Sequence, residues 1–141
     1  MTEVFLDSAF AIALELARDQ NHVAAQGHWS RFVASGQFFV TTSFVVDEAV
    51  TFLNARGFHD RAVRIGRRLM SDSRSQFVEV NRTLFLAGWD YLVRHPDKRY
   101  SPTDCISFEV MRQLGLRQAL TFDQHFAQAG FEITPAATAN E

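Results

Sequence analysis

The sequence predicts an α/β fold in three layers, in which helices cover both faces of a central parallel sheet of four to five strands. Short apolar runs that favour strands alternate along the chain with longer stretches of helical periodicity. Parallel strands need crossover connections, and helices are the usual crossover. The chain of 141 residues is 47% hydrophobic and 21% charged, which suits one ordinary globular core. We therefore expect a single domain over residues 1–133 and a flexible tail over 134–141, where small and polar residues dominate.

The first half of the chain repeats the pattern of a strand followed by a helix. The apolar run 4–6 ends at Asp7, and the run 38–40 ends at the hydroxyl residues 41–43. An amphipathic stretch follows each run, and a further helix is expected at 21–34, between the two units. Both runs are thus expected to be strands that end where a helix begins.

The second half supplies the remaining helices and strands. A helix after Gly57 has apolar residues on one face and arginines on another, and a second helix contains Leu84 and Leu92. The segment 101–104 begins a third helix, which ends near Gly115. The other expected elements are strands at 77–80 and 119–121, a short helix at 122–129, and a run at 131–133 that would add a fifth strand.

Composition limits the classes of partner and the location. The formal net charge of −2 creates no general field that attracts nucleic acid, so any contact with RNA has to be local. No apolar run approaches the roughly 20 residues that cross a bilayer, and the first residues lack the pattern of a secretory signal. Cys105 is the only cysteine, which suits a reducing compartment. We expect a cytoplasmic protein with no membrane partner.

Acidic residues stand at the predicted carboxyl ends of the strands. Asp7 and Asp123 each follow a strand, and Glu48 lies in the first turns of the helix after the second strand. Asp104 begins a helix that has to start near the same edge if the next strand is parallel to the others. Ligand sites of open α/β sheets lie beyond this edge, near the point where the strand order reverses. We therefore expect the four acids to converge.

Each acid also has a purely structural interpretation. The segment 101–104 has the pattern of a capping box with proline at the first helical position. Asp7 and Asp123 could stabilise the positive end of a helix dipole. Capping does not explain four acids at one edge, because clustered carboxylates raise one another's pKa and destabilise the fold unless a cation lies between them. A divalent cation is the simplest such partner.

The residue types favour a hard metal ion and phosphodiester hydrolysis. Carboxylate oxygens suit Mg²⁺ or Mn²⁺, and the chain lacks the cysteine set or the paired histidines of a zinc site. Metal ions held by carboxylates can activate a water molecule and stabilise the leaving oxygen. We expect Asp7, Glu48, Asp104 and Asp123 to be the catalytic residues and the metal ligands, one of them being available to accept the proton of the water.

Four segments of the chain carry a family resemblance. They are Phe5-Leu6-Asp7-Ser8, the stretch 42–53, the stretch 101–108 with Met111 behind it, and the stretch 121–126 followed by 129–131. Through these segments the chain resembles the PIN-domain superfamily of ribonucleases, in particular the VapC-like toxins of toxin and antitoxin pairs. In this resemblance the four acids fall on the four acidic positions of the family.

The resemblance implies a PIN-like endoribonuclease that uses Mg²⁺ or Mn²⁺, cleaves RNA and forms a homodimer. It also implies a small antitoxin protein whose tail lies in the active groove, where an arginine would pair with the acids. Two alternatives are a PIN-like module that binds RNA or a partner without cleavage, and a housekeeping nuclease that processes RNA. A phosphatase with Asp7 as nucleophile is disfavoured because Ala9 stands where such enzymes have a second aspartate.

Hydroxyl residues near the acids have two interpretations. Ser8, Thr42 and Ser43 could orient the acids or a water molecule, and they could equally cap the helices that they precede. His125 lies two residues after Asp123 and is left without a role.

Basic and aromatic residues give weaker indications. Candidate RNA contacts are Arg94, Lys98 and Arg99, which come just before the segment with Asp104. A row formed by Arg61, Arg64 and Arg68 could follow a phosphate backbone, although a solvated helix face explains it better. Trp29 and Trp89 lie on helical apolar stripes and fit the core or a dimer interface.

Overall fold

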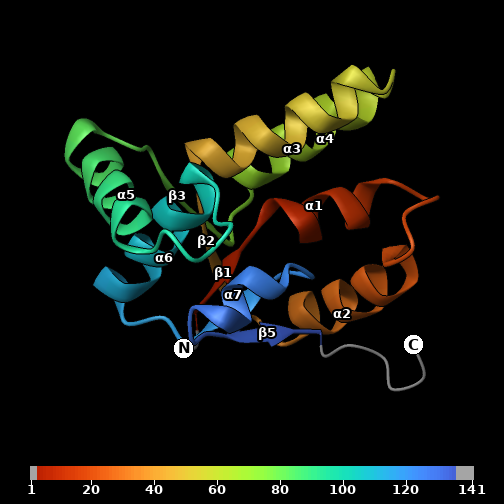
Figure 1. Ribbon diagram of the computed structural model, residues 1–141. Coiled ribbons are helices and arrows are strands. Elements are labelled where there is room, and N and C mark those ends of the chain that lie inside the picture. The colour runs from red at the N-terminus through yellow and green to blue at the C-terminus, as the bar shows by residue number, and fades with distance from the viewer. Residues whose placement is uncertain (1–2, 136–141) are drawn as a thin grey trace.

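The computed structural model describes residues 3–135, which form a five-stranded parallel sheet between two layers of helices (Figure 1). The strands are Glu3–Leu6 (β1), Phe38–Thr42 (β2), Ser75–Val78 (β3), Gln118–Leu120 (β4) and Glu132–Thr134 (β5). The helices are Ser8–Glu15 (α1), His22–Ala34 (α2), Ser43–Ala55 (α3), His59–Ser71 (α4), Arg82–Arg94 (α5), Pro102–Leu114 (α6) and Gln124–Gln128 (α7). The predicted α/β/α class is confirmed.

The strand order places β1 at the centre of the sheet. The order is β3-β2-β1-β4-β5, and every neighbouring pair is parallel. The chain therefore builds one side of the sheet with β2 and β3, and the other side with β4 and β5. The order in which strands are added therefore reverses between β1 and β4, although all strands stay parallel. The crevice beyond the carboxyl ends of these two strands is where an α/β sheet usually binds its ligand.

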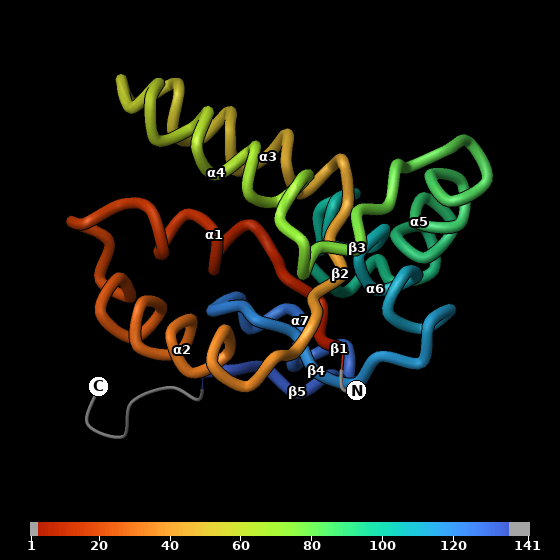
Figure 2. The backbone as a smooth tube through the Cα atoms, turned by 180° about the vertical axis from the view of Figure 1, so that it is seen from behind, coloured from red at the N-terminus to blue at the C-terminus, as the bar shows by residue number. Residues whose placement is uncertain are grey.

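The helices pack into two groups on either side of the sheet. One group is centred on α1, which contacts α2, α3 and α4, and the other is centred on α6, which contacts α5 and α7. The pair of α3 and α4 extends beyond the rest of the fold in both views (Figures 1 and 2). Between the layers lies a core in which large side chains such as Phe5, Phe39 and Phe108 are almost fully buried.

Several strand boundaries differ from the expectation by one or two residues. β2 continues to Thr42 rather than ending at residue 40, β3 begins at Ser75 rather than at residue 77, and β4 covers Gln118–Leu120 rather than 119–121. β3 ends at Val78 rather than at residue 80, because Val78 pairs with Thr42, the last residue of β2, and no strand continues beside the next residues. Thr134 belongs to β5 rather than to the expected tail, since it pairs with Leu120 and its carbonyl oxygen accepts a hydrogen bond from the Thr121 amide at 3.0 Å. The rest of the expected tail, from residue 136, lies outside the described residues.

Helices α3 to α6 fall where the periodicity predicts them, and α2 begins one residue later than expected. α7 covers Gln124–Gln128 rather than 122–129, because Asp123 is its N-cap. None of the helices within residues 3–135 combines the length and the apolar character that a membrane crossing requires.

Gly88 of α5 packs directly against Ile106 of α6. A Cβ atom at this position would lie 2.5 Å from Ile106 Cγ1 and 3.0 Å from the Ile106 backbone nitrogen. We expect Gly88→Ala to lower the free energy of unfolding by about 1–3 kcal/mol, because a well-packed core resists an added methyl group. Chemical denaturation measures this change in the free energy of unfolding. Gly27→Ala is the control: its nearest atom would be Arg31 Nη1 at 3.6 Å, so its stability should be unchanged or higher. Equal stability of both variants would contradict the prediction.

Candidate active site

All four predicted acids belong to segments that begin at the carboxyl edge of the sheet. Asp7 joins β1 to α1, and Asp123 precedes α7 and follows the strand β4. Asp104 lies in the first turn of α6, and Glu48 lies in the second turn of α3. The structure therefore brings together residues that are separated by more than a hundred positions in the chain.

Asp7 has the most unusual environment of the four acids. Its side chain is only 2% exposed, and although it occupies the N-cap position of α1 it makes no side-chain capping hydrogen bond. The Thr121 hydroxyl donates to Asp7 Oδ2 at 2.7 Å, whereas Asp7 Oδ1 is buried without a hydrogen-bond partner. Burial raises the pKa of Asp7 to about 7, opposed by the Thr121 hydrogen bond and assisted by the charges of Asp104 and Glu48.

Asp104 combines a structural role with a place in the acid group. Its carboxylate accepts a hydrogen bond from the Ser101 amide at 3.1 Å, and its own amide donates to Ser101 Oγ at 3.0 Å, so the predicted capping box is present. Burial nevertheless raises the pKa of Asp104 to about 6, against the lowering effect of the Ser101 amide, and the charge of Asp123 raises it further. The capping hydrogen bonds therefore do not fully stabilise the charged form of Asp104.

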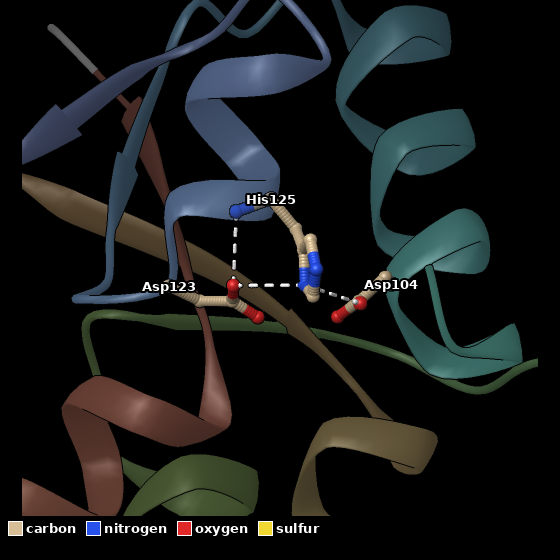
Figure 3. Close-up of side chains that lie close together, drawn as sticks. All are labelled: Asp104, Asp123 and His125. Carbon is tan, nitrogen blue, oxygen red and sulfur yellow. Dashed lines mark hydrogen bonds and ion pairs between the residues drawn. The ribbon is translucent and has the colours of Figure 1, made fainter. Parts of the chain in front are cut away.

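His125 joins Asp104 and Asp123 in a tight group (Figure 3). Its Nδ1 atom lies 3.0 Å from Asp123 Oδ1 and 3.5 Å from Asp104 Oδ2. Asp123 also caps α7, because its Oδ1 accepts the His125 amide at 2.9 Å. The Tyr100 ring packs perpendicular to the imidazole, with ring centroids 5.7 Å apart, and so holds the imidazole beside the acids. The sequence alone had indicated no role for this histidine.

Glu48 is linked to the other acids through Ser8 and through its charge. The Ser8 hydroxyl donates a hydrogen bond to Glu48 Oε1 across the start of α1 and α3. The negative charge of Glu48 raises the pKa of both Asp7 and Asp104. The four acids therefore form one electrostatically coupled group.

The group has the features of a cation site. One ligand atom each from Asp104, Asp123 and His125 lie within 4.8 Å of one another, whereas Asp7 and Glu48 lie outside this tight set. The unpaired Asp7 Oδ1 and the raised pKa values of two acids indicate a deficit of positive charge at this edge. Carboxylate oxygens suit Mg²⁺ or Mn²⁺, and imidazole also binds transition metals. The residues present thus fit a divalent cation.

The predicted supporting residues separate into different roles. Ser8 orients an acid, as one interpretation proposed, whereas Thr42 caps α3 by accepting the Val45 amide at 3.1 Å. Ser43 does neither, because its hydroxyl accepts the Val80 amide at 2.9 Å and so ties α3 to the segment after β3.

Sequence reasoning missed Thr121, which connects two of the acids. Its hydroxyl oxygen donates to Asp7 and accepts the Asp123 amide at 3.0 Å. The only sequence signal for this role was its position between a strand and an acid.

Two of the three predicted RNA-contacting residues form ion pairs with neighbouring acids. Arg94 Nε pairs with Asp90 Oδ2 at 3.0 Å on α5, and Lys98 lies 3.8 Å from the Asp97 carboxylate. Both pairs are exposed and therefore weak. Arg99 immediately precedes Tyr100, whose ring contacts His125.

The arginine row on α4 is largely engaged by one buried carboxylate. Glu15, which is 5% exposed, lies 3.1 Å from Arg64 Nε and 3.7 Å from Arg68 Nη1. Arg61 donates to the Glu15 carbonyl oxygen at 2.8 Å. The row therefore fastens the end of α1 to α4, which neither interpretation of the sequence anticipated.

Comparison with known proteins identifies the family. A family model described as the PIN domain matches residues 4–132. The chain belongs to the PIN-domain family. The PIN domain is 36% identical over 134 residues to a Mycobacterium tuberculosis protein named 23S rRNA-specific endonuclease VapC20, and the alignment covers 94% of this chain and 98% of the relative.

A solved structure shows the same similarity. The PIN domain aligns with the crystal structure of Mycobacterium tuberculosis VapC20, which is titled a sarcin-ricin loop cleaving toxin, at a TM-score of 0.81 and 35% identity. The alignment covers 91% of this chain and 95% of the other. The resemblance to VapC-like PIN domains that the sequence suggested is thereby confirmed.

Proposed function

We propose that this PIN domain is an Mg²⁺- or Mn²⁺-dependent endoribonuclease that hydrolyses phosphodiester bonds of RNA, and that it is the toxin of a toxin-antitoxin pair. The relatives support the nuclease class, since the similar protein is named an endonuclease specific for 23S rRNA. An RNA of the ribosome as substrate would place the activity in the cytoplasm. The names of the relatives favour the toxin over a housekeeping nuclease.

The observation that carries the proposal is the environment of Asp7. Asp104 and Asp123 cap helices, so their positions have a structural explanation. Asp7 caps nothing, is buried, and leaves Oδ1 without a partner beside two other acids. Such an arrangement costs stability in the absence of a cation, and it becomes favourable when a cation binds.

In this proposal, some residues bind the cation and others position the proton acceptor. Asp104, Asp123 and His125 would hold the cation, with Asp7 and Glu48 beside them adding negative charge. When bound, the cation supplies the positive charge that activates the attacking water and stabilises the leaving oxygen. Thr121 fixes Asp7 through Oδ2, which leaves Oδ1 available to accept a proton from the water.

Incubation of the purified protein with a 23S rRNA fragment that contains the sarcin-ricin loop tests the proposal. We expect cleavage with millimolar Mg²⁺ or Mn²⁺ and none with EDTA. The same RNA with the loop sequence scrambled serves as the control for specificity. Binding of the intact RNA without cleavage under every metal condition would favour a PIN-like module that binds without cutting.

The proposed partners are a small antitoxin and a second copy of this chain. An antitoxin arginine that reached Asp7 and Glu48 would provide the positive charge that the acids lack. For the second copy we propose the outer face of α5, where Leu86, Trp89 and Val93 are 46%, 50% and 55% exposed. A run of large apolar side chains on one helix face is typical of an interface.

A charge on this face should separate the copies. We expect Trp89→Glu to convert a dimer into a monomer, because the substitution places a carboxylate in the centre of the apolar face. Light scattering after gel filtration measures the mass. Val23→Glu is the control, since Val23 is 82% exposed on α2. A monomeric parent protein, or a dimer that survives Trp89→Glu, would disprove this interface.

A further inference from the structure

A groove with a cavity volume of about 320 Å³ opens beside the acid group. Ala9 and Ile12, one turn apart on α1, line it together with Phe52 of α3. On the side of the acids it is lined by Phe122 and Asp123. Its volume lies at the lower end of the roughly 300–1,000 Å³ of small-molecule sites. The groove therefore suits one flat ring system rather than an extended chain.

Two aromatic rings line the groove and are held in position from outside it. Phe122 is half-buried and stacks on Phe10, with centroids 5.9 Å apart and an interplanar angle of 11°. Phe52 is also half-buried, and the Arg56 guanidinium carbon lies 3.5 Å from the centroid of its ring. Rings that are fixed in this way lose little freedom when another flat group stacks on them. Base stacking on aromatic side chains is the usual mode by which proteins hold single-stranded RNA.

Two polar residues, Asp19 and Asn21, also line the groove. Asp19 Oδ1 accepts the Asn21 amide at 2.8 Å, which fixes the turn between α1 and α2. Asn21 occupies the N-cap position of α2, yet its side chain makes no capping hydrogen bond. Its carboxamide therefore offers a donor and an acceptor to a ligand, as the edge of a nucleobase requires.

Charge and position identify the occupant. Asp19 and Asp123 make the groove unfavourable for a phosphate, whereas a neutral base avoids this repulsion. Asp123 belongs to both the groove and the acid group, and Ala9 follows Asp7 by two residues. A nucleotide whose phosphate lies at the acids would therefore have its base within reach of the groove.

We propose that the groove between Phe52 and Phe122 binds the base of one nucleotide next to the cleaved bond, so that Phe52 and Asn21 help to select the cleavage site. This inference rests on the proposed ribonuclease function and adds to it a base-binding pocket. The base enters unpaired, so we expect cleavage only where the RNA is single-stranded or unstacked at the cut.

An abasic scan of the substrate tests the pocket. Short single-stranded RNAs that contain the cleavage site are made with one abasic nucleotide at each position flanking the cut. We expect one abasic position to lower kcat/KM of the parent protein by about tenfold or more, the loss that corresponds to one stacked base. For Phe52→Ala and for Asn21→Ala, the ratio of kcat/KM on the intact and the abasic RNA should fall toward one at that position.

Controls separate the pocket from general damage and from the ribonuclease function itself. Phe38→Ala removes a ring that is 39% exposed at the start of β2, on the opposite edge of the sheet, and should keep the full abasic penalty. Melting temperatures show whether Phe52→Ala is folded. If it is not, the abasic penalty of Asn21→Ala, at a partly buried turn residue, tests the pocket. A penalty that persists unchanged in both pocket variants, or the lack of a penalty at every position, would overturn the proposal.

If no RNA is cleaved, binding measurements test the base-binding pocket instead. The affinity of the same RNAs is then measured by fluorescence anisotropy with Mg²⁺ present. Weaker binding of one abasic RNA, with the difference lost in Phe52→Ala, would support the pocket even though the nuclease proposal had failed. Equal affinity for intact and abasic RNAs would overturn the pocket on its own.

Discussion

Replacing Asp7 with asparagine should abolish RNA cleavage and leave the metal-free protein at least as stable as the parent. The substitution keeps the shape of the side chain and an oxygen that can accept the Thr121 hydrogen bond. It removes the negative charge that the acid group uses to attract a cation, and the proton acceptor at Oδ1. Loss of several kcal/mol of charge stabilisation corresponds to a fall in kcat of roughly a thousandfold or more.

The two halves of this prediction are measured on the same preparation. Cleavage of the rRNA fragment gives the activity, and chemical denaturation in EDTA gives the free energy of unfolding. Asp47→Asn is the matched control, because it removes a charge from an exposed neighbour of Glu48 on α3 and should leave cleavage unchanged. A clear loss of metal-free stability in Asp7→Asn would show that its charge serves the fold, and would contradict the cation site.

The metal-free protein should lose stability as the pH rises from about 4 to about 7. The pKa of Asp7 is 3.8 in an unfolded chain and about 7 in the folded one, and that of Asp104 rises from 3.8 to about 6. Between these values the unfolded chain releases protons that the folded protein retains, so stability falls with increasing pH. For Asp7 alone the difference corresponds to roughly 4 kcal/mol at neutral pH, at about 1.4 kcal/mol per pH unit.

A divalent cation should reverse this loss. Millimolar Mg²⁺ or Mn²⁺ competes with protons for the carboxylates, so the rise in melting temperature should be largest above pH 7 and small near pH 4. Comparison with Asp7→Asn isolates the contribution of this carboxyl group from the other titrations. Melting curves that do not respond to metal at any pH, or a parent and variant with the same pH profile, would refute the prediction.

Local patterns were enough to predict most of the fold. Apolar runs that end at Asp7 and at residues 41–43 located β1 and β2, because strand ends carry the residues that start the next helix. The predictions erred where pairing decides the boundary. Residues 79–80 are β-prone, yet no neighbour strand continues beside them, and Thr134 looked like tail sequence although it pairs with Leu120.

The candidate site was predictable only in its acids. Asp104 lies in a recognisable capping box and Asp123 follows a predicted strand, so their positions at the edge of the sheet could be inferred. His125 could not be assigned, because its contact with both acids depends on how α6 and α7 pack. The role of Thr121 could not be predicted either, because its hydrogen bond to Asp7 links residues that lie 114 positions apart in the chain.

The sequence by itself determined the layered α/β class, the family resemblance and the four acids at one edge, because strand and helix periodicity and the residues at strand ends are local properties. Only the tertiary structure decided that Asp7 is buried without a partner at Oδ1, and that His125 completes the tight group. It also brought Phe52 and Phe122 together in the lining of one groove. Burial, charge coupling and cavity shape depend on segments that meet only when the helices pack on the sheet, and no local pattern encodes those distances.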